Sequence, residues 1–205
     1  MLGKIKRKIE EKYNVNINER VWDLLEMLMY CLIAFVIAYL VVTFVGQRTV
    51  VDGKSMYNTL DDGDNIIVEK LSYTFGEPER FDIIVFPHYD TMRGAEVYYI
   101  KRIIGMPGET IQISEGVIYL IDENGDKVRL EEEYGYYLDG MEMSGGIAST
   151  PVVIPEGYYF VLGDNRNNSK DSRDASVGLV KREDIMGKAW LRFYPFSDFG
   201  FITHE

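Results

Sequence analysis

The chain has 205 residues, of which 46% are hydrophobic, enough for one domain of ordinary size plus an appended segment. Its formal net charge of −11 argues against nucleic acid as a partner, because phosphate binding requires a basic face. The single cysteine, Cys31, excludes an intramolecular disulfide.

The first predicted element is a membrane-spanning helix over residues 27–45, MLMYCLIAFVIAYLVVTFV, which holds no charged residue. At about 1.5 Å per residue it spans roughly 28 Å, close to the hydrocarbon thickness of a bilayer. Its apolar residues surround the whole helix, which disfavours a buried core helix with one apolar stripe. A cleavable signal peptide would have a shorter apolar core and a small residue where Phe44 stands. We therefore expect an uncleaved transmembrane anchor.

The basic residues around this span predict its orientation. Arg48 and Lys54 are the nearest basic residues after the span. Because cytoplasmic flanks are enriched in Lys and Arg, the N-terminus is expected inside the cell. This divides the chain into a cytoplasmic segment (1–26), an anchor (27–45) and an extracytoplasmic domain (46–205). Six basic residues precede the span: Lys4, Lys6, Arg7, Lys8, Lys12 and Arg20.

After the anchor the chain reads as β-structure. Short segments rich in Ile, Val, Tyr and Phe are bounded by Gly, Pro or Asp, which is typical of strands. Asn124-Gly125 predicts a hairpin between residues 117–121 and 127–130. Residues 131–150 have no clear period and are expected to form a surface excursion. The fold class is therefore mostly β. Strands are expected at 64–70, 82–87, 96–105, 110–114, 116–121, 158–164 and 188–196.

The strand at 96–105, EVYYIKRIIG, has apolar residues on both alternating faces, so both faces should be covered. Lys101 and Arg102 then point to opposite faces. Apolar surroundings lower the pKa of a lysine, and a neutral lysine can take a proton from a serine nucleophile. The alternative is a lysine at a strand edge that blocks aggregation. Ser55, in VVDGKSMYNTL (50–60), is correspondingly either such a nucleophile or a loop residue that caps a helix.

Other chemistry is disfavoured by the remaining residues. His88 and His204 lie near no recognisable acid–base motif, and both are expected to be solvent-exposed bystanders. Two histidines without cysteine partners do not make a zinc site, so no metal or cofactor is expected. Residues 105–108 lack the Gly-Lys-Ser/Thr ending of a phosphate loop and read as a turn. The polar stretch at 163–173, GDNRNNSKDSR, predicts tight turns.

Four ordered blocks resemble the motifs of bacterial type I signal peptidases. They are GKSM (53–56), GD with KLSY (63–64 and 70–73), KRIIGMPGE (101–109) and GDNRNNSKDSR (163–173). Phe193 to Pro195 fit a typical closing strand. The resemblance implies a membrane-anchored serine endopeptidase with a mostly-β catalytic domain. Such an enzyme removes signal peptides from exported preproteins at the outer face of the plasma membrane.

The resemblance also implies residue roles. Ser55 is the expected nucleophile and Lys101 the general base, with Ser169 orienting the lysine. Two charge pairs, Asp164 with Arg102 and Asp171 with Arg173, are expected to brace the site. The backbone N–H of Ser55 would donate to the oxyanion.

Two positions depart from the family pattern. Gly53 stands where some members have a hydroxyl residue that supplies a second oxyanion donor, and Asn58 stands where proline is usual. Ser55 lies ten residues after Val45, so an extended link reaches at most about 33–36 Å. The expected partners are preproteins and the lipid bilayer, with a position near the secretion translocase also compatible.

Two alternatives belong to other functional classes. A catalytically inactive, membrane-anchored β domain that binds exported proteins or cell-wall components would not need Ser55 and Lys101 together. A self-cleaving serine–lysine regulator would be cytosolic and linked to DNA, which the anchor and the acidic composition oppose.

Overall fold

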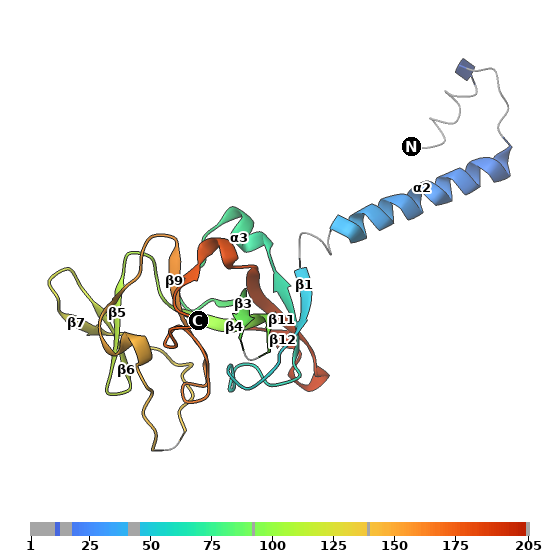
Figure 1. Ribbon diagram of the computed structural model, residues 1–205. Coiled ribbons are helices and arrows are strands. Elements are labelled where there is room, and N and C mark those ends of the chain that lie inside the picture. The colour runs from blue at the N-terminus through green and yellow to red at the C-terminus, as the bar shows by residue number, and fades with distance from the viewer. Residues whose placement is uncertain (1–10, 13–17, 41–45, 92, 139, 204–205) are drawn as a thin grey trace. The chain divides into compact units, whose positions relative to one another are not determined.

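The computed structural model describes residues 11–12, 18–40, 46–91, 93–138 and 140–203. Two compact units make up the chain, residues 1–45 and residues 46–205 (Figure 1).

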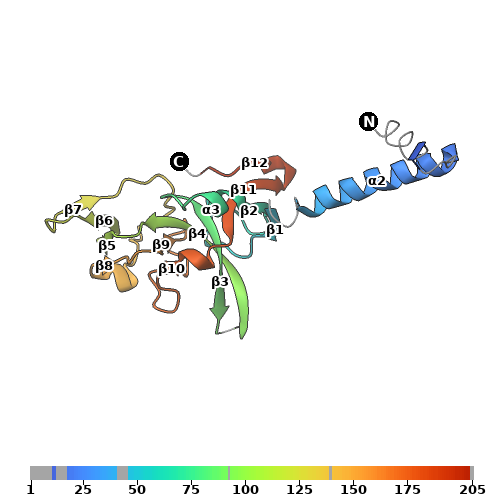
Figure 2. The same cartoon turned by 90° about the horizontal axis from the view of Figure 1, so that it is seen from above.

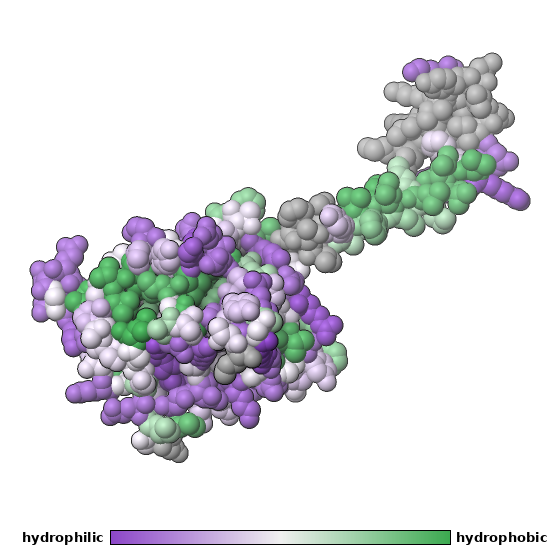
Figure 3. Space-filling model, viewed as in Figure 1, coloured by the Kyte–Doolittle hydropathy of each residue, from purple (hydrophilic) through white to green (hydrophobic). Residues whose placement is uncertain are grey.

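The first unit contains helix α2 (Glu19–Leu40). The helix begins earlier than the apolar run predicts, because Asn18 caps its N-terminus: the Asn18 side chain accepts a hydrogen bond from the Arg20 backbone N–H at 2.9 Å. Apolar side chains cover its surface (Figure 3), and residues Glu19–Tyr39 are long and apolar enough to cross a membrane. The predicted end of the anchor, 41–45, lies outside the described residues.

The second unit is built on two antiparallel sheets, so the mostly-β fold class is confirmed. The larger sheet has the strand order β1-β2-β11-β3-β4-β9-β10, with β12 paired to β11. Its strands are β1 (Gly46–Val50), β2 (Asn65–Glu69), β3 (Ile83–Asp90), β4 (Ala95–Gly105), β9 (Tyr158–Leu162), β10 (Val180–Lys181), β11 (Gly187–Tyr194) and β12 (Gly200–Phe201).

The smaller sheet has the order β7-β6-β5-β8 and lies at the opposite end of this unit from β1 (Figure 1). Its strands are β5 (Thr110–Ser114), β6 (Val117–Ile121), β7 (Lys127–Arg129) and β8 (Val152–Val153). The hairpin predicted at Asn124-Gly125 is confirmed, since β6 pairs with β7. Short helices complete the unit: α3 (Leu71–Phe75), η2 (Gly146–Ser149), η3 (Arg182–Asp184) and η4 (Phe196–Asp198).

All the predicted strands form, but β1 and the two-residue strands β8, β10 and β12 were not predicted. Strand β1 is the longest of these four. Its sequence, GQRTV, has neither strict alternation nor a run of large apolar residues. It pairs only with β2 and is an edge strand, so burial imposes little pattern on it.

The core follows from side-chain alternation in the central strands. In β3, Ile83 and Val85 belong to one buried cluster, whereas Ile84 and Phe86 belong to another on the opposite face. A third cluster, which includes Ile104, Ile111 and Phe160, joins the two sheets. The first half of β3, residues 83–86, is therefore covered on both sides.

The prediction that β4 is covered on both sides is correct for only half of the strand. Residues 100–105 are buried, but residues 95–99 are not, and Tyr98 is 51% exposed. The reason is the strand pairing: β3 pairs with β4 from Ala95 onward, whereas β9 pairs with β4 only from Arg102 onward. The outer half of β4 therefore projects with β3 as a two-stranded arm (Figure 2).

Most described residues of the segment 131–150 are exposed or partly exposed, but the segment is held to the domain at several points. Met143 and Ala148 are buried in the cluster that joins the sheets. Tyr136 donates its backbone N–H to the Asp164 carbonyl at 2.7 Å and accepts one from Arg166 at 2.9 Å. The segment lacks a period because its residues are held by irregular loops of the domain rather than by a sheet face.

Candidate active site

Ser55 lies in the turn that follows β1. Gly53 begins this turn with φ +95°, a left-handed conformation that suits glycine, and donates its N–H to the Asp62 carboxylate at 2.8 Å. The Ser55 carbonyl accepts the backbone N–H of Asn165 at 3.1 Å. Within the described residues the Ser55 N–H has no hydrogen-bond acceptor. The turn is thus held from both sides while one backbone donor next to Ser55 stays available.

Strand β4 brings Lys101 to this turn. Its Nζ lies 2.8 Å from Ser55 Oγ and donates to the Ile100 carbonyl at 2.7 Å. Lys101 is only 3% exposed. Burial lowers its pKa to about 8, although the carboxylates of Asp171 and Asp164 partly oppose this by favouring the charged form. A lysine with this pKa is neutral in roughly a tenth to a fifth of the molecules near neutral pH, and in that form it can accept the proton of the serine it touches.

Ser169 lies near the Ser55 turn and makes no hydrogen bond to Lys101 among the described residues. Its Oγ is buried and has no hydrogen-bond partner among the described residues. A Cβ added at Gly163 would stand 2.2 Å from Ser169 Oγ and 2.4 Å from the Ser55 carbonyl oxygen. Ser169 and the Ser55 turn therefore both pack on the bare Cα of Gly163. The role of Ser169 in orienting the lysine stays a prediction.

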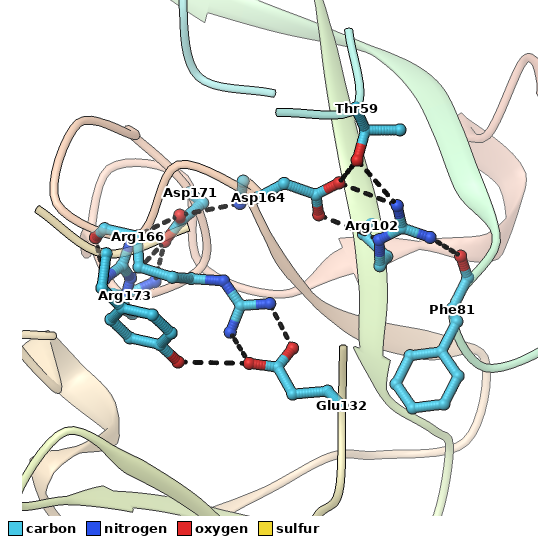
Figure 4. Close-up of polar contacts among 10 residues, drawn as sticks. Thr59, Phe81, Arg102, Glu132, Asp164, Arg166, Asp171 and Arg173 are labelled. Carbon is cyan, nitrogen blue, oxygen red and sulfur yellow. Dashed lines mark hydrogen bonds and ion pairs between the residues drawn. The ribbon is translucent and has the colours of Figure 1, made fainter. Parts of the chain in front are cut away.

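Both predicted charge pairs form beneath the site (Figure 4). Arg102 donates to both carboxylate oxygens of Asp164, at 2.9 and 2.7 Å, and both side chains are fully buried. Arg173 likewise forms a bidentate ion pair with Asp171, with nitrogen–oxygen distances of 2.8 and 2.7 Å. Asp171 also accepts the backbone N–H of Gly163 at 3.0 Å. Each carboxylate is thus neutralised and hydrogen-bonded, as burial of charge requires.

The structure adds members to this network that the sequence did not indicate. Thr59 donates its hydroxyl to Asp164 at 2.6 Å, and the Arg102 guanidinium lies 3.7 Å from the Tyr134 ring centre. Arg166 forms a buried bidentate ion pair with Glu132 (Figure 4). The only sequence signal was the run of three glutamates at 131–133.

Among the described residues, no hydrogen bond joins His88 to Ser55 or Lys101. His88 is half-buried rather than exposed, with its ring centre 4.6 Å from that of Tyr99, and burial lowers its pKa. Within the described residues its Nε2 has no hydrogen-bond partner. His204 lies outside the described residues.

The departure at Asn58 has a structural reason. Asn58 adopts φ +88°. Proline is locked near −65° and cannot take this conformation, whereas asparagine tolerates it. The turn after Ser55 therefore follows a path that the usual proline would forbid.

A cleft of about 400 Å³ opens beside the two central residues. One wall is residues 49–52 at the end of β1, the other is residues 97–101 of β4, and Ser55 and Lys101 both line it. Strand β1 pairs only with β2, and this part of β4 pairs only with β3. Each wall therefore presents an unpaired strand edge to the cleft.

Comparison with known proteins places the chain among known families. Residues 24–194 match the family described as signal peptidase, peptidase S26. The chain belongs to this family. A probable signal peptidase I-2 of Synechocystis sp. is 36% identical over 193 residues, covering 91% of this chain and 80% of that protein. A signal peptidase I of Bacillus amyloliquefaciens is 37% identical over 171 residues, covering 82% and 83%.

Among solved structures, a signal peptidase I from Enterococcus faecalis V583 is 35% identical. It matches 55% of this chain and 96% of that chain, with a TM-score of 0.41. The S26 match spans all four motif blocks, from the Ser55 turn to the loop at 163–173.

Proposed function

We propose that this S26 peptidase cleaves the signal peptides of exported preproteins with Ser55 as nucleophile and Lys101 as general base. The observation that carries this assignment is the 2.8 Å separation of Lys101 Nζ and Ser55 Oγ, with the lysine buried and its pKa lowered to about 8.

The chemistry follows from this contact. Neutral Lys101 takes the Ser55 proton as Oγ attacks the scissile carbonyl, and the Ser55 N–H donates to the oxyanion that forms. The lysine ammonium then protonates the leaving amine, which is the new N-terminus of the mature protein. In the second half, Lys101 accepts a proton from the water that attacks the acyl–enzyme ester. The lysine then returns that proton to Ser55 Oγ as the serine leaves, which restores the neutral amine and the free hydroxyl.

The cleft supports binding of the substrate as an extended strand. A peptide laid between residues 49–52 and 97–101 can pair with the unpaired backbone groups of either wall. Main-chain pairing holds substrates of different sequence, which suits an enzyme that acts on many preproteins. The pairing also places one peptide bond next to Ser55.

The anchor supports a location at the membrane. Helix α2 is long and apolar enough to span the bilayer, and the basic residues that precede it place residues 46–205 outside the cell by the positive-inside rule. There the domain meets preproteins whose own signal helices lie in the same bilayer, next to the secretion translocase that exports them.

The test uses the purified full chain in detergent with one preprotein. Ser55→Ala and Lys101→Ala should each abolish cleavage, and Lys101→Arg should do the same because guanidinium stays protonated. The double variant should be no worse than either single one, since the two groups act as a unit. His88→Ala is the control and should retain most activity. Substantial cleavage by Lys101→Ala would refute the dyad, and an inactive wild type would favour the binding-domain alternative.

A further inference from the structure

A second cavity, of about 520 Å³, adjoins the same turn. Lys54 and Tyr57, which flank Ser55 and Met56 in the sequence, line this cavity, whereas Ser55 and Met56 themselves line the catalytic cleft. The two cavities therefore share the turn that carries the nucleophile. A chain bound in the cleft and continuing past Ser55 has the second cavity immediately beyond.

Asn165, which lines this cavity, carries an unmet hydrogen-bond acceptor. The residue is 6% exposed, and its Nδ2 donates to the Lys54 carbonyl at 3.0 Å. That bond fixes which end of the amide is the donor, so the oxygen must be the other end. Asn165 Oδ1 is buried and has no partner among the described residues. A buried acceptor without a donor is unfavourable, and a peptide N–H of a bound chain would satisfy it.

The remaining lining favours a cation. Two acidic residues, Asp61 and Asp62, line the cavity together with one basic residue, Lys54. The rings of Tyr57 and Tyr136 meet edge to face with centres 4.9 Å apart. Carboxylates attract a lysine or arginine side chain directly, and aromatic faces add a cation–π attraction.

We propose that this cavity binds the first residues of the mature chain, just downstream of the scissile bond, and selects for a basic side chain there. Asn165 Oδ1 accepts a backbone N–H of that segment. At about 3.3–3.6 Å per residue, the first three residues after the cut cover roughly 10 Å, which places the second and third mature residues at the cavity. The inference rests on the proposed function, because it takes Ser55 as the point of cleavage.

The test compares preproteins that are identical up to the scissile bond. Their second and third mature residues are Lys, Gln or Glu, and kcat/KM is measured with the full chain in detergent. The kcat/KM for the Lys preprotein should exceed that for the Glu preprotein by about two- to five-fold, and the value for the Gln preprotein should lie between them. Asp61→Lys should abolish or reverse this order. Glu123→Lys makes the same charge change at an exposed turn that lines neither cavity, and should preserve the order.

The hydrogen bond is tested on the substrate, which avoids disturbing the Asn165 contact with the Ser55 turn. Peptide substrates carry an ester in place of the amide N–H of the second or third mature residue. One of the two should lose about two- to ten-fold in kcat/KM. An ester eight residues downstream is the control and should have no effect.

The outcomes separate this inference from the function on which it rests. Equal kcat/KM for the three preproteins, an unchanged order in Asp61→Lys, or no loss with either ester would overturn the inference while Ser55-dependent cleavage still upholds the function. Absence of Ser55-dependent cleavage of every substrate would overturn both.

Discussion

At the scale of single residues, the proposed mechanism makes activity depend on the pKa of Lys101. Burial depresses that pKa to about 8. Below it the lysine is protonated and cannot accept the serine proton, so kcat/KM should fall about tenfold for each pH unit toward acid. Above it the amine is neutral and the rate should level off. A pH–rate profile of the wild type, with chemistry shown to be rate-limiting, measures the inflection.

An inflection near the ordinary lysine pKa, about 10.4, would mean that burial does not tune Lys101. A profile without an acid limb would mean that no titrating base governs the reaction.

Gly163 makes a second residue-scale prediction. A methyl group there would overlap Ser169 Oγ and the Ser55 carbonyl oxygen, both closer than 3 Å to its Cβ position. Because the Ser55 contact is with backbone, the turn must move to relieve the clash. Gly163→Ala should therefore lower kcat by more than about 100-fold, since small displacements of a reacting group have large effects.

Gly157→Ala is the control for that prediction. Its Cβ meets nothing within 4 Å, but its φ of +75° is also unfavourable for alanine, so it reports backbone strain without a clash at the site. Equal kcat in the two variants would show that the close approach at Gly163 is unimportant.

At the scale of elements, the segment after β7 carries part of the support of the site. Glu132 neutralises Arg166, whose side chain is fully buried. Glu132→Gln leaves a buried guanidinium without its counter-charge, which should lower the free energy of unfolding by about 3–5 kcal/mol. Denaturant titration of the full chain in detergent measures this change.

The neighbouring glutamate provides a matched control. Glu131 is exposed and pairs with the exposed Arg129 at 3.4 Å. Glu131→Gln removes the same charge one residue away and should change stability by about 1 kcal/mol at most. Similar losses in the two variants would show that burial of the Glu132 pair does not decide its contribution.

At the scale of the whole molecule, the anchor determines where catalysis takes place. Protease added to right-side-out vesicles should digest residues 46–205, because the proposed orientation keeps the Lys/Arg-rich segment before the helix inside. In inverted vesicles the same domain should be protected. The opposite pattern would reverse the proposed orientation and remove the catalytic domain from the exported substrates.

Local patterns in the sequence were sufficient for the class of fold and for most strands. The apolar run of β3 and the turn at Asn124-Gly125 depend on residues that are neighbours in the chain, so they can be read without coordinates. Ser55, Lys101 and both charge pairs were predicted from the resemblance of the motif blocks to a known family. The apolar neighbours of Lys101 by themselves indicated only that its pKa would fall.

The tertiary structure decided what depends on residues distant in the chain. Glu132 meets Arg166, Asn165 meets Lys54, and the bare Cα of Gly163 meets Ser55, although no local pattern links the members of these pairs. The pairing of β9 with only the inner half of β4 likewise determined which part of that strand is buried. Propensity and periodicity describe a residue's neighbours along the chain, whereas burial, charge pairing and unmet hydrogen bonds depend on which segments the fold brings together.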